Sequence, residues 1–267
     1  MAFKSTLCFA SIDYTNQALI IPKVSDAKPT AGLRVKQVHK EYQETQIYHT
    51  LFLPTNWDKT KKYPVIIEYP GNKWRDYSGT VEACKLGYGL SGGKDVIWVC
   101  LPFIDTKNKM QTTTWWGDVK ATVDYCKKTI ELICSKYGGD PNNLFIAGFS
   151  RGSIACNYIG LHDDEIAALW KGFICHSHYD GVRKWPYKNS DISSAALRLK
   201  RLKNRPQFIS QEKNITPIRQ YLKKTYPKGN FKFLEMPSQS HNDTWVLQKS
   251  KDSDLLKRWF WENVKKP

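Results

Sequence analysis

The stretch IAGFSRGSI at residues 146–154 places Ser150 between Gly148 and Gly152, directly after an apolar run. The three fixed letters of this Gly-x-Ser-x-Gly pattern are common, so the pattern alone is a weak signal. Its context strengthens it, because 143–149 has the pattern of a buried strand and 151–160 that of a helix. A sharp strand-to-helix turn exposes its central residue and needs small neighbours. We therefore predict that Ser150 is a nucleophile on such a turn; the alternative is a hydroxyl in an ordinary glycine-bracketed loop.

Strand and helix patterns alternate along most of the chain. Strands are predicted at 46–54, 63–69, 95–103, 143–149, 169–177, 206–210 and 231–237. Helices are predicted at 118–137, 151–160, 215–225 and 244–264. This alternation predicts an α/β fold with a mainly parallel, twisted sheet and helices on both faces. We expect an irregular N-terminal arm over 1–34 and a single domain over 35–267, with the chemistry at the carboxyl ends of the strands.

Composition and charge narrow the class of protein. The 267 residues are 41% hydrophobic, which is typical of a globular chain, and no apolar run is long enough for a membrane helix. The net charge of +16 predicts a solvated basic surface or attraction to an acidic polysaccharide. No nucleic-acid motif accompanies the charge, so no nucleic-acid partner is expected. The N-terminal segment is a poor signal peptide, which leaves a cytoplasmic protein and a secreted one lacking its signal both open.

The sequence predicts neither a metal site nor a cofactor. The seven cysteines form no C-x-x-C pair and are expected to be buried free thiols, with a bridge involving Cys8 or Cys84 left open. The acidic cluster LHDDE at 161–165 lacks the i, i+4 histidine pair of a metalloenzyme helix. No phosphate-binding glycine loop and no dinucleotide fingerprint is found, and the oligomeric state is left open.

Three segments resemble serine esterases of the α/β-hydrolase superfamily, in particular single-domain polyhydroxybutyrate-depolymerase and feruloyl- or acetylxylan-esterase types. These segments are YPVIIEYPGN (63–72), KYGGDPNNLFIAGFSRGS (136–153) and FKFLEMPSQSHND (231–243). The resemblance spans roughly residues 46–262, and the middle motif is its most specific part. It implies the chain order nucleophile, acid, histidine. His241, in the loop after the last predicted strand, is then the general base for Ser150.

The resemblance leaves two candidates for the acid of the triad. The family usually places it in the turn after the penultimate strand, where Glu212 is the single carboxylate of FISQEKNITP. The family's Gly-x-x-Asp spacing is replaced here by Ser210-Gln-Glu-Lys. Asp180, in HSHYDG after the preceding strand, is the alternative acid.

The remaining site residues follow from their places at strand ends. The backbone N–H of Arg151 is expected to form the oxyanion hole with that of Asn72, or of Gly71, in a loop where the family often has His-Gly. The Arg151 side chain is expected either to bind an acidic group on the substrate or to pair with a structural carboxylate. The residues predicted to bind substrate, or else to serve in packing and local hydrogen bonds, are Trp74, Trp115, Trp116, His176 and His178.

These residues predict a serine esterase that cleaves a carboxylic ester through an acyl-enzyme. The expected partner is a small-molecule or polysaccharide ester, and the basic surface and tryptophans favour a carbohydrate-linked substrate, including one with acidic groups. One alternative is a peptidase or acyl transferase with the same triad. Another is a non-catalytic carbohydrate-binding protein on the same fold, which is favoured if neither Glu212 nor Asp180 reaches His241.

Overall fold

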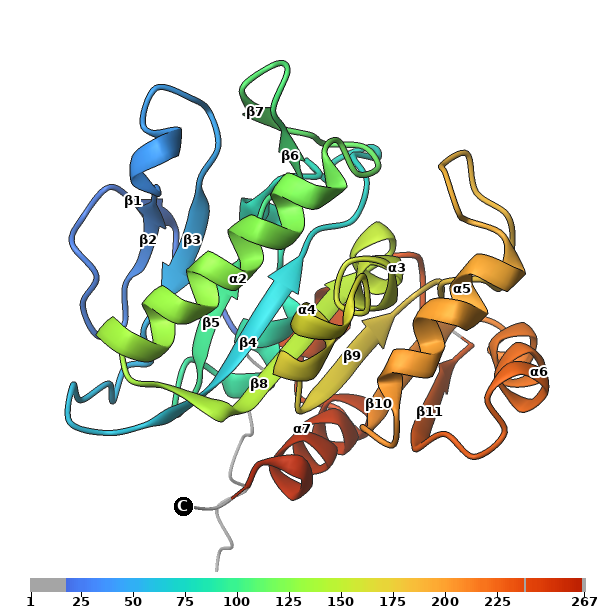
Figure 1. Ribbon diagram of the computed structural model, residues 1–267. Coiled ribbons are helices and arrows are strands. Elements are labelled where there is room, and N and C mark those ends of the chain that lie inside the picture. The colour runs from blue at the N-terminus through green and yellow to red at the C-terminus, as the bar shows by residue number, and fades with distance from the viewer. Residues whose placement is uncertain (1–17, 238, 266–267) are drawn as a thin grey trace, which may run out of the picture.

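The computed structural model describes residues 18–237 and 239–265, which build around one central sheet (Figure 1). In spatial order its strands are β1 (Val24–Ser25), β2 (Arg34–Gln37), β3 (His49–Phe52), β5 (Ile97–Cys100), β4 (Tyr63–Tyr69), β8 (Gly139–Phe149), β9 (Gly172–His176), β10 (Gln207–Glu212) and β11 (Phe231–Met236). From β5 to β11 every neighbouring pair is parallel, whereas β3 pairs antiparallel with both β2 and β5. The predicted mainly parallel sheet is confirmed.

Helices cover both faces of the sheet, as predicted (Figure 1). The α-helices are α1 (Leu86–Ser91), α2 (Val119–Lys136), α3 (Arg151–Tyr158), α4 (Asp164–Leu169), α5 (Ile192–Leu199), α6 (Thr216–Thr225) and α7 (Lys251–Asn263). Side chains of α2 to α6 join one buried cluster, and those of α1 and α7 join a second on the opposite face. Strand β4 feeds both clusters by alternation, since Val65 and Ile67 enter the first and Ile66 the second.

Helix α2 shows how local sequence sets an element's limits. Asp118 caps its start by accepting a hydrogen bond of 2.9 Å from the backbone N–H of Ala121. The helix ends at Lys136, before Gly138 takes a φ of +80°, a conformation that glycine adopts without strain. A Cβ at Gly138 would also lie 2.4 Å from the carbonyl oxygen of Lys61. The end predicted at the double glycine is therefore confirmed.

Some predicted boundaries are wrong, for identifiable reasons. The helix predicted over 244–264 is two elements, the 3₁₀ turn η4 (Thr244–Leu247) and α7, because Ser250 and Ser253 form a capping box that starts a new helix. The strand predicted over 46–54 narrows to β3, the part that pairs with β2 and β5. The hairpin of β6 (Ile104–Asp105) and β7 (Met110–Gln111) was not predicted, since two-residue strands carry no periodicity.

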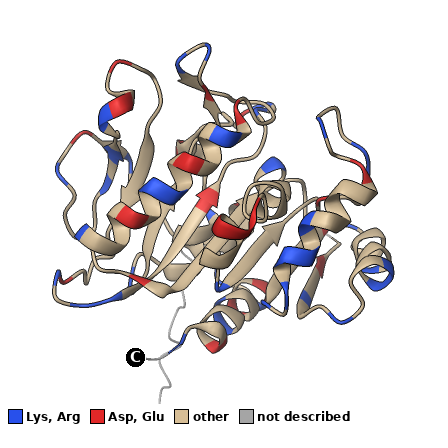
Figure 2. Cartoon of the chain, viewed as in Figure 1, with Lys and Arg blue, Asp and Glu red and all other residues tan. Residues whose placement is uncertain are grey.

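The described residues also test the charge and cysteine expectations. No described helix is long and apolar enough to cross a membrane. Lys and Arg are spread over helices and loops along the chain, with Asp and Glu between them on α2 (Figure 2). The thiols of Cys84, Cys100, Cys126, Cys134, Cys156 and Cys175 are free, and all are buried except that of Cys134, which is half-buried. Cys8 lies outside the described residues.

Candidate active site

Ser150 occupies the predicted sharp turn between β8 and α3. Its backbone has a φ of 55° and a ψ of −113°, a strained conformation for a residue with a side chain. The Ser150 N–H donates a hydrogen bond of 2.9 Å to the carbonyl of His176 on the neighbouring strand β9. This bond fixes the turn at the carboxyl end of the sheet, where the hydroxyl can face solvent.

The two glycines of the motif are required by space. A Cβ on Gly148 would lie 2.1 Å from the backbone carbon of Gly152, and a Cβ on Gly152 would lie 2.0 Å from the carbonyl oxygen of Tyr69. No larger residue fits either position without moving backbone atoms. The spacing Gly-x-Ser-x-Gly is therefore a packing requirement of this turn, which excludes the ordinary-loop alternative for Ser150.

The structure brings Ser150, His241 and Glu212 into one chain of hydrogen bonds. His241 Nε2 lies 3.2 Å from Ser150 Oγ, and His241 Nδ1 is hydrogen-bonded to Glu212 Oε1. A proton on Nδ1 satisfies the carboxylate and leaves Nε2 free to accept the serine proton. The residues come from three separate places in the fold: the turn after β8, the end of β10 and the loop after β11.

Ser177, which sequence reasoning missed, completes the surroundings of Glu212. Its hydroxyl donates to Glu212 Oε1 at 2.7 Å and lies 2.9 Å from His241 Nδ1. Burial by itself raises the pKa of Glu212, but the hydrogen bond from His241 and smaller effects, Ser177 among them, lower that pKa to about 2. Glu212 is thus an anion across the neutral pH range. The sequence signal for Ser177 was its place directly after β9, between the predicted site residues His176 and His178.

Asp180, the alternative acid, is engaged elsewhere. Both its carboxylate oxygens accept hydrogen bonds from Arg198, at 2.9 and 3.0 Å, and the carboxylate is buried. Asp243, two residues from His241, forms an ion pair of 2.9 Å with Lys85. Among the described carboxylates, Glu212 is the partner of His241, so the alternative of Asp180 is not supported by the geometry.

The loop after β4 and the start of α3 hold the backbone N–H groups that were predicted to form an oxyanion hole. The N–H of Gly71 donates to the hydroxyl of Tyr77 at 3.2 Å. The N–H groups of Asn72 and Arg151, by contrast, have no acceptor in the described part of the chain, and both residues line the cleft above Ser150. Unpartnered N–H groups facing a nucleophile are what an oxyanion hole requires. The geometry favours Asn72 over Gly71 as the second donor.

The cleft above Ser150 has a volume of about 870 Å³ and is walled by aromatic rings. Trp74, Trp115 and Trp185 line it, with Trp74 66% exposed. Trp185, which was not predicted, has its ring 5.4 Å from that of Trp115 and 3.5 Å from the guanidinium carbon of Arg183. The prediction that Trp116 binds substrate is wrong, because its ring is buried and stacks on Tyr158 at 4.6 Å.

The two histidines after β9 separate into different roles. His176 is buried, with Nδ1 3.0 Å from Ser210 Oγ and Nε2 2.9 Å from the carbonyl oxygen of Asn242. It supports the loop that carries His241 and does not line the cleft, so its substrate-binding prediction is wrong. His178 does line the cleft, with its ring 5.1 Å from that of His241. Burial lowers the pKa of His178 to about 4, which keeps the ring neutral near pH 7.

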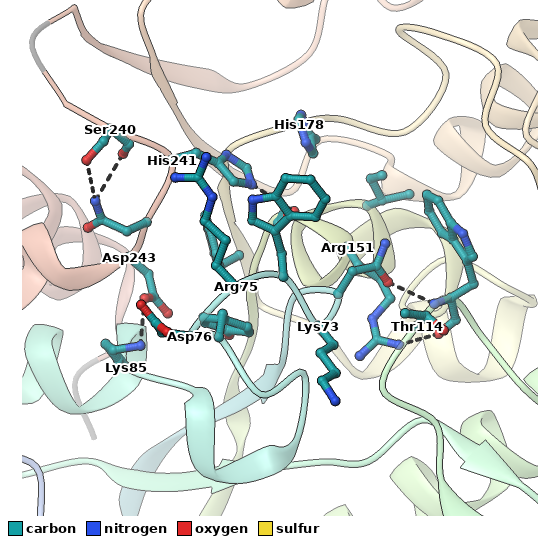
Figure 3. A pocket seen from close by; sticks show the side chains of 18 of the residues that line it. Lys73, Arg75, Asp76, Lys85, Thr114, Arg151, His178, Ser240, His241 and Asp243 are labelled. Atoms are coloured by element: carbon teal, nitrogen blue, oxygen red, sulfur yellow. Dashed lines mark hydrogen bonds and ion pairs between the residues drawn. The ribbon is translucent and has the colours of Figure 1, made fainter.

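Neither expected role of the Arg151 side chain is found. The guanidinium is buried, points away from His241 and donates to backbone carbonyls rather than to a carboxylate (Figure 3). Sequence could not show this, since the acceptors lie 36 to 81 residues earlier in the chain.

One described cluster has metal-ligand chemistry, with donor atoms of Glu68, Cys84 and Cys100 within 4.8 Å of one another. Both oxygens of Glu68 already accept hydrogen bonds, from the N–H groups of Lys85, Leu86, Gly87 and the Trp98 indole. The Glu68 carboxylate therefore stabilises the N-terminus of α1 by accepting hydrogen bonds from its first backbone N–H groups.

No protein-family model matches the sequence, and no curated protein matches it significantly. Solved structures do match. A thermostable esterase is 15% identical over 86% of this chain and 62% of its own, with a TM-score of 0.55. The feruloyl esterase module from Clostridium thermocellum, solved with sinapinate, is 14% identical over 93% and 94%, with a TM-score of 0.54. The chain has the α/β-hydrolase fold.

The fold also occurs among peptide-bond hydrolases. The AtxE2 isopeptidase, solved with astexin-3 bound, is 11% identical over 88% of this chain and 40% of its own, with a TM-score of 0.55. The present chain thus spans less than two thirds of the length of the thermostable esterase and of the isopeptidase. At these identities the likeness establishes the fold, and the chemistry has to be argued from the site.

Proposed function

We propose that the protein is a serine hydrolase that cleaves carboxylic esters through an acyl-enzyme. The hydrogen-bonded series Ser150–His241–Glu212 on the strained turn carries this proposal. It favours catalysis over a purely binding role, since a binding protein has no need of an imidazole held between a serine and a buried anion.

Ser150, His241 and Glu212 supply the side-chain groups for both halves of the proposed reaction. Ser150 Oγ attacks the ester carbonyl carbon while His241 Nε2 takes its proton. The carbonyl oxygen becomes an oxyanion, which the N–H groups of Arg151 and Asn72 stabilise. The C–O bond to the alcohol then breaks, and Nε2 returns the proton to the leaving oxygen. Water attacks the acyl-enzyme with the same proton relay, which releases the acid and regenerates Ser150. Throughout, Glu212 keeps the imidazole oriented and stabilises its charged form.

For the substrate we propose an ester linked to a carbohydrate that carries an acidic group. One support is the set of tryptophans that line the cleft. Another is the charge of the lining: Lys85 and Asp243 pair with each other, and the cations of Lys73, Arg75 and Arg183 then outnumber the one carboxylate of Asp76. Indole faces suit sugar rings, and guanidinium groups suit carboxylates or sulfates. A panel of acetylated, feruloylated and uronate-ester sugars beside short p-nitrophenyl esters and peptide amides tests this. Preference for amides would favour the peptidase alternative.

A fluorophosphonate probe tests the nucleophile directly. We expect the wild type to be labelled at Ser150, with the adduct located by peptide mass spectrometry. Ser150→Ala is expected to abolish labelling, whereas Ser135→Ala, which removes an exposed serine on α2, leaves it unchanged. A folded wild type that resists the probe under conditions that label a control esterase contradicts the proposal.

A further inference from the structure

The Arg151 side chain makes an unusual set of contacts beneath the candidate oxyanion hole. A guanidinium has five N–H donors, and here five backbone carbonyls accept from it. The acceptors are the carbonyls of Trp115 (2.6 Å), Gly71 (2.9 Å), Gly79 (3.0 Å), Thr112 (3.3 Å) and Pro70 (3.4 Å). They belong to two loops, one after β4 and one after β7, so this one side chain ties together the loops that flank Ser150.

The charge of this guanidinium is not neutralised by a carboxylate. Within the described residues Arg151 forms no ion pair, and its nearest aromatic partner is the ring of Phe103, 4.1 Å from the guanidinium carbon. Burial lowers the pKa of Arg151 to about 9, so the group still carries its charge near pH 7. The dipoles of these carbonyls and the face of the Phe103 ring therefore stabilise the Arg151 cation beneath the loop after β4.

The Gly71–Asn72 peptide unit connects this cation to the site. Its carbonyl accepts from Arg151 Nη2, and its N–H is the free donor of Asn72. In a planar trans peptide the C=O and N–H point in opposite directions. A carbonyl held on the guanidinium side therefore directs the N–H to the other side, where Asn72 lines the cleft. A charged donor on the carbonyl also polarises the peptide and strengthens its N–H as a donor.

Two further bonds hold the adjoining atoms, the Asn72 side chain and the next peptide unit. Asn72 Oδ1 accepts from the Trp115 N–H at 2.8 Å, and the Lys73 N–H donates to the Thr113 carbonyl at 2.7 Å. Both join the loop after β4 to the loop after β7, the same pair that Arg151 joins. The carbonyl of the Gly71–Asn72 peptide is thus held by Arg151, and Asn72 is held by the loop after β7.

We propose that the Arg151 side chain is a positioning residue for the oxyanion hole, which orients and polarises the Gly71–Asn72 peptide so that the Asn72 N–H meets the developing negative charge. Arg151 then contributes to the oxyanion hole in two ways. Its backbone N–H is one donor, and its side chain orients the Asn72 N–H, which is the other. This inference rests on the proposed ester hydrolysis.

Arg34 on β2 provides a matched control. It too is buried, donates to backbone carbonyls of Val81 (2.9 Å) and Glu82 (3.3 Å), and lies over an aromatic ring, that of Trp98 at 4.4 Å. It does not line the cleft. A lysine at either position keeps a charge but offers three donors without the planar fork. Both variants are therefore expected to lose stability, and only the variant at Arg151 is expected to lose transition-state stabilisation.

The experiment compares Arg151→Lys and Arg34→Lys on an ester that the wild type hydrolyses. For Arg151→Lys we expect kcat to fall roughly 10- to 100-fold with KM within about 3-fold, since a donor that acts in the transition state is weakened. A boronic acid that forms a tetrahedral adduct with Ser150 should bind more weakly by a similar factor. Arg34→Lys should keep kcat and boronate affinity within about 2-fold. Equal losses in the two variants, an effect on KM alone, or an unchanged kcat in Arg151→Lys would overturn the inference.

A second variant covers the case in which Arg151→Lys does not fold. Asn72→Ala keeps the backbone N–H but removes the Oδ1 bond to Trp115 that holds Asn72. We expect kcat to fall about 5- to 10-fold at constant KM, with matching loss of boronate affinity. An unchanged kcat in Asn72→Ala would also overturn the inference. A wild type that hydrolyses no ester instead contradicts the proposed function, so the two failures are distinguishable.

Discussion

Glu212 and Asp180 are two buried carboxylates near the carboxyl ends of neighbouring parallel strands, yet the fold uses them in opposite ways. Glu212 ends β10 and accepts from His241 and Ser177. Asp180 follows β9 by four residues and is held by the fork of Arg198. Burial raises the pKa of Asp180, with Arg198 opposing, whereas the pKa of Glu212 is lowered to about 2. The partner of each carboxylate therefore decides its role, because an imidazole can pass a proton on and a guanidinium cannot.

The largest effect on activity is expected from removing the negative charge of Glu212. Glu212→Gln keeps the size of the side chain but removes the anion that fixes the His241 tautomer. We expect kcat to fall roughly 10³- to 10⁴-fold on an ester substrate, by analogy with the loss of the acid in other serine triads. Steady-state kinetics measures this, with circular dichroism to establish folding. A loss under 10-fold would mean that Glu212 is not the orienting acid.

Asp180 is expected to contribute to stability rather than to the rate of the reaction. Asp180→Asn leaves the buried guanidinium of Arg198 without its charge partner, and we expect the free energy of unfolding to fall by about 3–5 kcal/mol. Its kcat should stay within about 3-fold of the wild type, because Arg198 and Asp180 do not line the cleft. Urea denaturation and kinetics on the same preparation test both halves. A kcat loss as large as that of Glu212→Gln would reverse the two assignments.

The smallest effect is in the pH dependence of stability. The folded-state pKa of Glu212, about 2, lies below its ordinary value of 4.5. Its contribution is therefore fully present above about pH 4.5 and is lost as the pH falls toward 2. As the pH falls through this window, the free energy of unfolding should fall more steeply in the wild type than in Glu212→Gln. The two slopes should differ by at most about 1.4 kcal/mol per pH unit. Parallel curves from denaturation at pH 5 to 2.5 would show that the pKa of Glu212 is not lowered by folding.

Features that depend on residues close together in the chain could be predicted from the sequence, and features that depend on contacts between distant segments could not. The turn at Ser150 was predictable because the glycine spacing, the upstream apolar run and the downstream helix are all local. Glu212 could be placed after a strand, although its choice over Asp180 depended on Arg198, which no local pattern pairs with Asp180. The contacts of Arg151 were beyond prediction for the same reason: five carbonyls from two distant loops meet it only in the folded chain.

The backbone of Ser150 has a consequence for how this protein can change over time. A residue with φ of 55° and ψ of −113° costs of order 1–3 kcal/mol unless it is glycine. Ser150→Gly is then a substitution that relieves strain while it removes the hydroxyl. A lineage released from selection for the reaction would gain stability by losing its serine, so persistence of serine at this position across descendants would itself record that the chemistry is being used.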